Sequence, residues 1–524
     1  MKRHKVEIFF VLTLLLLLGL TKWARIGLSS LQILFSLAVI SLIIHEIYWK
    51  RRKLPNGPIP WLTLGNMATL ATANFDDLMS KWRRKYGGIF TVWIGPFPLV
   101  MVNDVGTMKK YFVQNGELFS NRWRNFVTDS FMNGANGLIQ IDGEKWREQR
   151  RFSLHVLRNF GVGQHRMERK ILSEVRHLTS YLQKNGEIDL CTPLAVCVGN
   201  IINDMLFGIT FPQGSIEMKR LHSLLDAQSK LVVNPLMGLY IAAPFATKIP
   251  FLNKPWLELI KHRDHLWDFL GKQVQSHIEM FNNGHSTIDD FTFAYLEEMD
   301  RRKEIGETGY FNEWQLQMLL LDLFFAGMET TVTTLKWAFL LMITHPVVMK
   351  NVQKELDCLN VSEVGLRERS LTPYTQAVIC EIQRIANILP INLLRTVCDD
   401  VEIDGYTFPK GTMVIPQISI MLNDETVFEE PKEFRPERFL DDEGKLKRID
   451  QFMPFSLGRR QCLGESLARA ELFLIFSNVI KEFDILPVPG EIYSRKRALG
   501  LTVSPQKYRV HLVPRKLDTN MNPV

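Results

Sequence analysis

Ten residues near the C-terminal end of the chain read Phe455-Ser456-Leu457-Gly458-Arg459-Arg460-Gln461-Cys462-Leu463-Gly464, and an apolar helical pattern that reaches Ile480 follows them. Gly458 suits a tight backbone bend that needs positive φ. Cys462 stands where the helix begins, and a helix N-terminus favours a thiolate over a thiol. Gly464 has no side chain, so the helix can lie close against a flat bound group. A cysteine in an apolar setting is usually a small core residue, but these neighbours predict a ligand thiolate at Cys462.

The complete pattern F-x-x-G-x-R-x-C-x-G resembles the haem-binding signature of the cytochrome P450 family. The resemblance implies a mainly α-helical fold with small β-sheets and a single catalytic domain over about residues 54 to 515. It also implies haem B as the cofactor, with Cys462 as the axial ligand of the iron. Phe455 and Arg460 belong to the same cofactor site, and Arg460 is expected to meet a haem propionate. An axial thiolate donates electron density that favours cleavage of the O–O bond.

A second motif lies on a long apolar pattern far upstream. Asn312, with Gln315 three residues later, predicts the start of a helix. The run from Trp314 to Ile343 is apolar nearly all round, and Pro346 ends it. Charged residues such as Asp322 interrupt the run, so we predict a helix buried in a large core and not a membrane span.

The middle of this predicted helix carries Ala326-Gly327-Met328-Glu329-Thr330-Thr331. Taken alone, the acid could be a partly solvated charge and the threonines could be β-branched core residues. Beside a haem, Ala326 and Gly327 would let the helix backbone approach the porphyrin. The Thr330 hydroxyl would compete for a main-chain carbonyl and distort the helix locally. Glu329 and Thr330 then resemble the acid–alcohol pair of the P450 family, whose job is to deliver protons during oxygen reduction.

Three further residues resemble those that hold the haem propionates in the family. Trp146 and Arg150 lie one helical turn apart, so both can face the same propionate, although Trp146 alone would also suit a packed core. Arg395 is the third candidate. The resemblance therefore implies a cofactor site with several cations.

Glu381 and Arg384 are three residues apart, a spacing that on a helix surface gives a common and weak pair. Together with Arg438 they resemble the internal Glu-Arg-Arg network of the family. We therefore assign these three residues to the architecture behind the haem and not to the chemistry.

Three longer stretches resemble the microsomal, family 2-like branch of these enzymes: residues 146–163, 406–416 and 452–465. By the same resemblance, the substrate-facing regions are residues 123–138, 321–329, 388–394 and 499–501. Most side chains in these regions are apolar, and no buried cation stands out as a clamp for a carboxylate. We expect a small lipophilic substrate, which would be a xenobiotic, a fatty acid or a steroid.

Two apolar stretches precede the catalytic region. Residues 26–44 carry no charge, and their length is close to the ~20 residues that cross a bilayer. The basic cluster at residues 50–53 is expected on the cytoplasmic side. Residues 8–20 are short for a span. They form either a second membrane segment or a cleaved signal peptide, but Lys22 directly after them favours an anchor.

We therefore interpret residues 1–53 as an N-terminal membrane anchor and residues 54–524 as a haem-thiolate monooxygenase domain. Three prolines within residues 54–60 exclude a helix there and predict a stiff spacer. The expected location is the endoplasmic reticulum membrane, with the catalytic domain facing the cytosol.

Composition limits the classes of partner. The net charge of +7 is small for 524 residues and argues against nucleic acid, although it suits contact with a membrane surface or an acidic protein. The six cysteines are scattered and form no CxxC pair, so neither a zinc site nor a disulfide framework is indicated. No GxGxxG motif follows a predicted strand, so we expect no nicotinamide site in the chain itself.

Three functions are compatible with the motifs. The first is monooxygenation of the substrate by O2, with NADPH electrons from a separate flavoprotein reductase and a possible contribution from cytochrome b5. Lys145, Arg147, Arg151 and Arg459 are candidates for the docking face, although they could simply be solvated. The second is an isomerase or dehydratase of peroxides, and the third is a non-catalytic haem sensor. The intact pair of Glu329 and Thr330 favours the monooxygenase.

Overall fold

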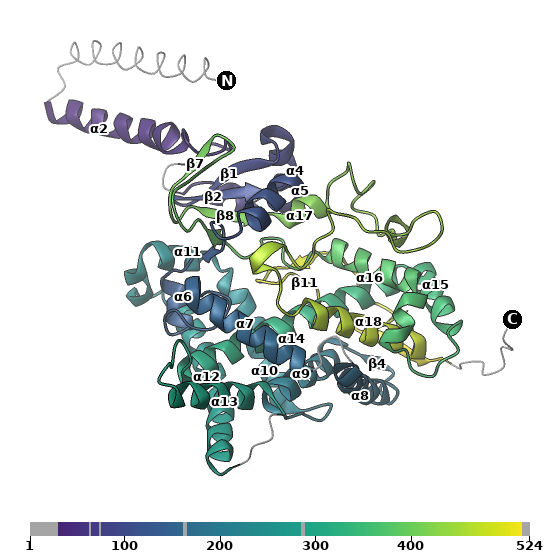
Figure 1. Cartoon of the computed structure of the whole chain (residues 1–524). Coiled ribbons are helices and arrows are strands. Elements are labelled where there is room, and N and C mark those ends of the chain that lie inside the picture. The colour runs from purple at the N-terminus through teal and green to yellow at the C-terminus, as the bar shows by residue number, and fades with distance from the viewer. Residues whose placement is uncertain (1–29, 62–63, 73–74, 161–164, 285–288, 516–524) are drawn as a thin grey trace.

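The computed structural model describes residues 30–61, 64–72, 75–160, 165–284 and 289–515 of the chain. Helices make up most of this body and small sheets are attached to it, as the sequence predicts (Figure 1). The longer helices are α4 (Phe75–Tyr86), α7 (Gly143–Asn159), α8 (His165–Leu182), α9 (Cys191–Phe207), α10 (Ile216–Val232), α12 (Lys254–Asn282), α13 (Phe291–Glu304), α14 (Glu313–Thr344), α15 (Pro346–Asp357), α16 (Pro373–Ala386) and α18 (Glu465–Glu482). Shorter helices are α3 (Met67–Thr72), α5 (Val105–Lys109), α6 (Phe126–Phe131), α11 (Pro235–Ala242) and α17 (Ile418–Leu422). Short 3-10 or π-helical segments are η1 (Trp49–Arg51), η2 (Lys110–Gln114), η3 (Pro244–Lys248), η4 (Leu366–Leu371), η5 (Pro436–Phe439) and η6 (Gly458–Arg460).

Helix α14 is the centre of the fold. The Asn312 side chain caps its first turn by accepting a hydrogen bond from the Gln315 amide at 2.9 Å, and α15 begins directly after it at Pro346. By length and composition α14 could cross a membrane, but 72% of its most apolar window is buried in the protein. Its neighbours are α9, α12, α16 and α18. The prediction of a buried core helix is therefore confirmed.

The largest sheet combines strands from both halves of the chain. Its order is β1 (Ile89–Ile94), β2 (Phe97–Val102), β8 (Met413–Pro416), β5 (Arg395–Thr396) and β3 (Asn121–Arg122). Only the β2–β8 pair is parallel, with Leu99 opposite Met413. The β3–β5 pair sets Arg122 opposite Arg395. This sheet therefore brings two arginines that are distant in sequence to one place.

The other sheets are small. One contains β4 (Glu187–Ile188), β12 (Val510–Pro514) and β9 (Phe483–Pro487), and β10 (Arg497–Ala498) pairs with β11 (Ser504–Pro505). A hairpin joins β6 (Val401–Ile403) to β7 (Tyr406–Phe408). Asp404 and Gly405 form its turn with φ of 53° and 74°, which is the geometry that an Asp-Gly turn favours.

The N-terminal helix α2 (Ser30–Ile47) overlaps the predicted span 26–44 and projects from the body (Figure 1). Leu34 and Phe35 on it are exposed. The predicted segment 8–20 lies outside the described residues. The proline-rich segment 54–60 contains no helix, as expected, but it packs on β1: the amide of Thr91 donates to the carbonyl of Asn56 at 3.3 Å.

Behind the central helices, the three charged residues of the predicted internal network meet in the core. The Arg384 guanidinium donates to both carboxylate oxygens of Glu381, at 2.7 and 2.8 Å, and Arg438 donates to the same carboxylate at 3.1 Å. The side chains of Glu381 and Arg384 have no exposed surface. Removing one partner of a buried ion pair typically costs about 3–5 kcal/mol, so this network is a structural element and not a surface pair.

Candidate active site

The loop that carries Cys462 lies between η6 and α18. Gly458 has a φ of +72°, and a Cβ at this position would collide with the carbonyl of Phe112. The predicted glycine bend is therefore confirmed, since other residues rarely adopt this conformation. The amide of Cys462 donates to the carbonyl of Phe455 at 3.0 Å. This hydrogen bond closes the loop and fixes the position of the sulfur just before the helix.

The Cys462 side chain has solvent-accessible surface although it lies within the body of the protein. Burial raises the pKa of its thiol, while the backbone N–H of Gly464 lowers it and Glu465 raises it further. In the protein alone, burial thus outweighs the helix N-terminus that was expected to favour the thiolate. A metal ion deprotonates a coordinating thiol outright. The Cys462 thiol would therefore lose its proton on binding a metal ion.

Four arginines gather around the same loop. Arg150, Arg395 and Arg460 were predicted here, and Arg122 on β3 joins them. Burial, and next the charge of Arg122, lower the pKa of Arg460, with further contributions from its other neighbours. Burial, followed by the charge of Arg150, likewise lowers the pKa of Arg122 to about 10. The ring of Trp146 lies under the Arg460 guanidinium, with 3.9 Å from the guanidinium carbon to the ring centroid.

None of these arginines forms an ion pair with a carboxylate in the part of the chain that the structure describes. Guanidinium groups remain protonated in proteins, and a cluster of unpaired cations is unfavourable unless an anion joins it. Their hydrogen bonds go largely to main-chain carbonyls: Arg122 to Ile139 and Leu393, Arg150 to Gln461, Arg395 to Leu457, and Arg460 to Ser120 and Ile141.

This donor set fits haem. The two propionates of the cofactor would supply the missing anions for the arginine cluster, which we define as Arg122, Arg150, Arg395 and Arg460. Cys462 would hold the iron, and Trp146 and Phe455 would contribute apolar surface. Haem iron with an axial thiolate supplies the activation of O2.

On α14, the Thr330 hydroxyl makes the hydrogen bond to a main-chain carbonyl that the sequence predicts. Its hydroxyl donates to the carbonyl of Ala326 at 2.7 Å, and its own carbonyl accepts from the Thr334 hydroxyl at 2.8 Å. Helix α14 nevertheless runs as one α-helix through this point, so the expected distortion does not interrupt it. Ala326, one turn before Thr330, is exposed although the surrounding helix is buried. This face of α14 therefore borders an interior space.

Glu329 has partners different from those of Thr330. Its carboxylate is buried and accepts hydrogen bonds from the hydroxyls of Thr502 at 3.2 Å and Thr333 at 3.4 Å. Burial, and next the charge of Asp226, raise the pKa of Glu329 to about 7. The raised pKa favours proton transfer near neutral pH.

Gly327 faces the neighbouring helix α9. A Cβ on Gly327 would come within 2.6 Å of the Ile202 side chain on α9. The missing side chain therefore allows α9 and α14 to pack closely. Ala326 is the residue of this pair on the Thr330 face.

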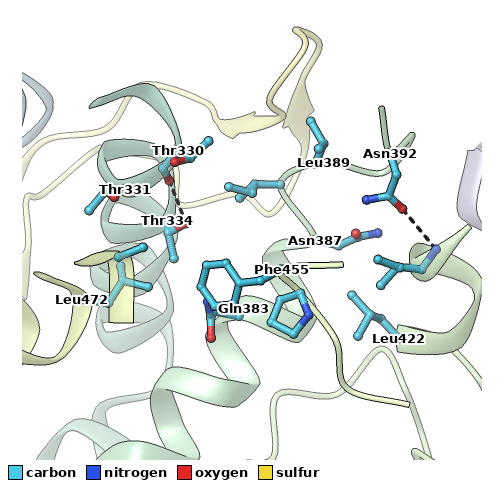
Figure 2. Close-up of a pocket in the computed structure, with 14 residues that line it drawn as sticks. Thr330, Thr331, Thr334, Gln383, Asn387, Leu389, Asn392, Leu422, Phe455 and Leu472 are labelled. Atoms are coloured by element: carbon cyan, nitrogen blue, oxygen red, sulfur yellow. Dashed lines mark hydrogen bonds between the residues drawn. The ribbon is translucent and has the colours of Figure 1, made fainter. Parts of the chain in front are cut away.

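Two cavities lie next to these residues. The smaller has a volume of about 70 Å³ and is lined by Thr330, Phe455 and Leu472 among others (Figure 2). The larger has a volume of about 1370 Å³ and contains residues from three of the predicted substrate-facing regions, including Trp123, Leu393 and Leu501. The fourth region, 321–329, lines neither of these two cavities.

Two features of the site were not predicted. Arg122 had no motif around it, and only its pairing opposite Arg395 reveals it. Asp322 was treated as an interruption of an apolar run, but its carboxylate accepts from the amides of Leu138 and Ile139 at 2.6 and 2.8 Å. Asp322 thereby fixes the end of a substrate-facing loop to α14.

The comparisons with known proteins agree with this geometry. The family model described as Cytochrome P450 matches residues 55–512. The chain is 34% identical to mouse (Mus musculus) cytochrome P450 2J5, over 94% of this chain and 98% of the relative. It is 35% identical to human (Homo sapiens) cytochrome P450 2J2, over 91% and 95%, and to rabbit (Oryctolagus cuniculus) cytochrome P450 2B4, over 93% and 99%. The chain therefore belongs to the cytochrome P450 family, as a haem-thiolate monooxygenase of the microsomal, family 2-like type.

Proposed function

We propose that this monooxygenase receives NADPH electrons through a separate flavoprotein reductase and inserts one atom of O2 into a small lipophilic substrate, which is a xenobiotic, a fatty acid or a steroid. The observation that carries the proposal is that Thr330 lines the same cavity as Phe455, the first residue of the cysteine loop (Figure 2). A hydroxyl in this place can pass protons inward while electrons arrive. An isomerase of peroxides or a haem sensor does not need proton delivery.

The Thr330→Ala variant tests this proposal. Without the hydroxyl, proton delivery is slower or misdirected, and reduced oxygen leaves as hydrogen peroxide. With reductase and NADPH, we expect the variant to keep its thiolate spectrum and to consume NADPH. Product should fall on the order of 10²-fold and peroxide should rise. The measurement is the ratio of product to NADPH consumed, for several lipophilic substrates.

Thr344→Ala is the matched control. The Thr344 hydroxyl makes the same kind of bond, to the carbonyl of Leu340 at 3.0 Å, but it lies at the far end of α14. This variant should stay coupled. If Thr330→Ala also stayed coupled for every substrate, the hydroxyl would serve only helix packing, and the peroxide isomerase would become the better reading.

The proposed docking face for the reductase is on α7. Arg147 and Arg151 are exposed there and form no ion pair with any residue that the structure describes. Lys145 instead donates a hydrogen bond to the carbonyl of Ala135 at 2.6 Å. Arg459 forms an ion pair with Glu117 at 2.6 Å. Two of the four predicted cations are thus available to an acidic partner. We propose the same face for cytochrome b5.

We propose that residues 1–53 anchor residues 54–524 to the endoplasmic reticulum membrane, with the catalytic domain in the cytosol and in contact with lipid. The exposed apolar side chains of α2 support an anchor. Deleting residues 1–47 leaves η1 and the packed segment after it, so the variant should bind haem normally while its association with membranes becomes weaker. The measurement is the fraction that sediments with microsomes at high salt. Unchanged sedimentation would contradict this topology, as would glycosylation in cells of Asn360, which begins the acceptor sequence Asn360-Val361-Ser362.

A further inference from the structure

The carboxylate of Glu329 lies between α14 and α10. Its Oε1 accepts from Thr502 and Thr333, but its Oε2 is buried and has no hydrogen-bond partner among the described residues. The nearest cation-forming group is His222 on α10, whose Nε2 is 3.8 Å from this Oε2. A small rotation of either side chain would bring the two atoms to hydrogen-bonding distance. The unpartnered oxygen of Glu329 is thus next to an imidazole.

His222 is more exposed to solvent than this acid. It keeps 13% of its side-chain surface exposed, whereas Glu329 keeps 5%. It lines neither of the two cavities described above. One turn further along α10, Asp226 forms an exposed ion pair with Lys230 at 2.6 Å. The exposed fraction of the side chain therefore decreases from Asp226 to His222 to Glu329.

The charges around His222 keep its imidazole neutral. Burial lowers the pKa of His222 to about 4, Lys336 on α14 lowers it as well, and Asp226 raises it in part. Asp189 before α9 and Lys230 on α10 have smaller opposing effects. A neutral imidazole has one nitrogen that donates and one that accepts, so it can give a proton on one side and take one on the other.

We propose that His222 is a positioning residue that returns protons from solvent to Glu329 across the interface of α10 and α14. The inference rests on the proposed function, in which Glu329 supplies protons toward Thr330. In the step, the His222 Nε2–H bond breaks and its proton goes to the Glu329 carboxylate, while Nδ1 takes a proton from a hydronium ion of the solvent. The ring then turns Nε2 toward solvent, where Nε2 takes a second proton from hydronium and Nδ1 releases one to water, which restores the Nε2–H tautomer. One proton enters per cycle and no electrons move in this step.

The first test measures proton exchange and not turnover. A protonated carboxylic acid has its own carbonyl stretch in the infrared, and the band that disappears in Glu329→Gln belongs to Glu329. After rapid mixing of the full-length holoenzyme with D2O, this band should shift quickly in the wild type. In His222→Phe and His222→Gln the shift should be slower, on the order of 10²-fold.

Two controls make this result specific. His265→Gln changes an imidazole on α12 whose Nδ1 hydrogen-bonds the carbonyl of Lys261 on the same helix, and should leave the exchange unchanged. Glu471 is a second buried acid, whose pKa is raised by burial to about 8 and which accepts from the Thr331 hydroxyl at 3.0 Å. Its band should exchange equally in all variants. Exchange of the Glu329 band at the wild-type rate in both His222 variants would overturn the proposal.

Turnover separates this inference from the proposed function. With reductase and NADPH, both His222 variants should lose product formation. With hydrogen peroxide as the oxidant, which brings its own two protons and two electrons, they should retain it. Loss of both activities would indicate structural damage and overturn the relay.

If Glu329→Gln slows NADPH-driven turnover while His222→Gln and His222→Phe do not, the relay is wrong and the proposed function stands. If Thr330→Ala and Glu329→Gln both have no effect, the proposed function itself fails.

Discussion

Replacing Cys462 with alanine is expected to abolish the red-shifted Soret band that the reduced, carbon monoxide-bound protein shows, together with all product formation. The shift arises from thiolate ligation of the iron, and Cys462 is the cysteine that lies among the four arginines. The measurement is the carbon monoxide difference spectrum of the purified variant, with its haem content determined separately.

Cys380→Ala and Cys398→Ala are the matched controls, and both should keep the band. Burial raises the pKa of the Cys380 thiol to about 11, and the Cys398 thiol donates to the carbonyl of Glu117 at 3.0 Å. Neither lies in the loop that Arg150 and Arg395 contact at the carbonyls of Gln461 and Leu457. A normal thiolate spectrum in Cys462→Ala would contradict the assignment and would make these two residues the next candidates.

The double variant Arg150→Ala with Arg460→Ala is expected to lose haem readily. A hydrogen bond to a charged group contributes about 1.5–3 kcal/mol, so two of them correspond to about 10²- to 10⁴-fold in haem affinity. The measurement is the rate of haem transfer to an excess of a haem-binding acceptor protein.

The control pair is Arg147→Ala with Arg151→Ala, which removes the same total charge from α7 and its surroundings but only at exposed positions. This pair should retain haem. A second readout separates cofactor binding from folding. The four arginines repel one another in the haem-free protein, but Arg460 also donates to the carbonyls of Ser120 and Ile141, so the free energy of unfolding of the haem-free double variant is measured beside its haem affinity. Haem retention equal to wild type in Arg150→Ala with Arg460→Ala would contradict the propionate site.

Local patterns explain which parts of the site could be predicted. The bend at Gly458 and the cap at Asn312 depend on residues that are close in sequence, and both are found as expected. The apolar run of α14 predicted a buried helix, since a helix that is apolar on all faces is buried in any protein with a large enough core. The prediction of Cys462 and Thr330 as site residues also rests on local motifs.

Long-range packing explains the rest. Arg122 reaches the site because β3 pairs with β5, which no local pattern indicates. The direction of the Glu329 carboxylate depends on α10 and Thr502, and the space beside Gly327 is filled by Ile202 of α9. Burial of Cys462 opposes its ionisation, although the helix start alone suggested the reverse. Each of these depends on a neighbour that is distant in sequence.

The largest sheet also limits when haem can bind while the chain is being translated. Its β3 strand ends at Arg122, but its partner β5 begins only at Arg395. At a typical rate of synthesis, roughly 14–55 s pass between the appearance of these two residues. Closing so long a loop is also slow compared with forming local helices. The nascent chain therefore carries Arg122 and Arg150 through about half of translation before Arg395 exists, and the complete haem site is expected only after Cys462 has been synthesised.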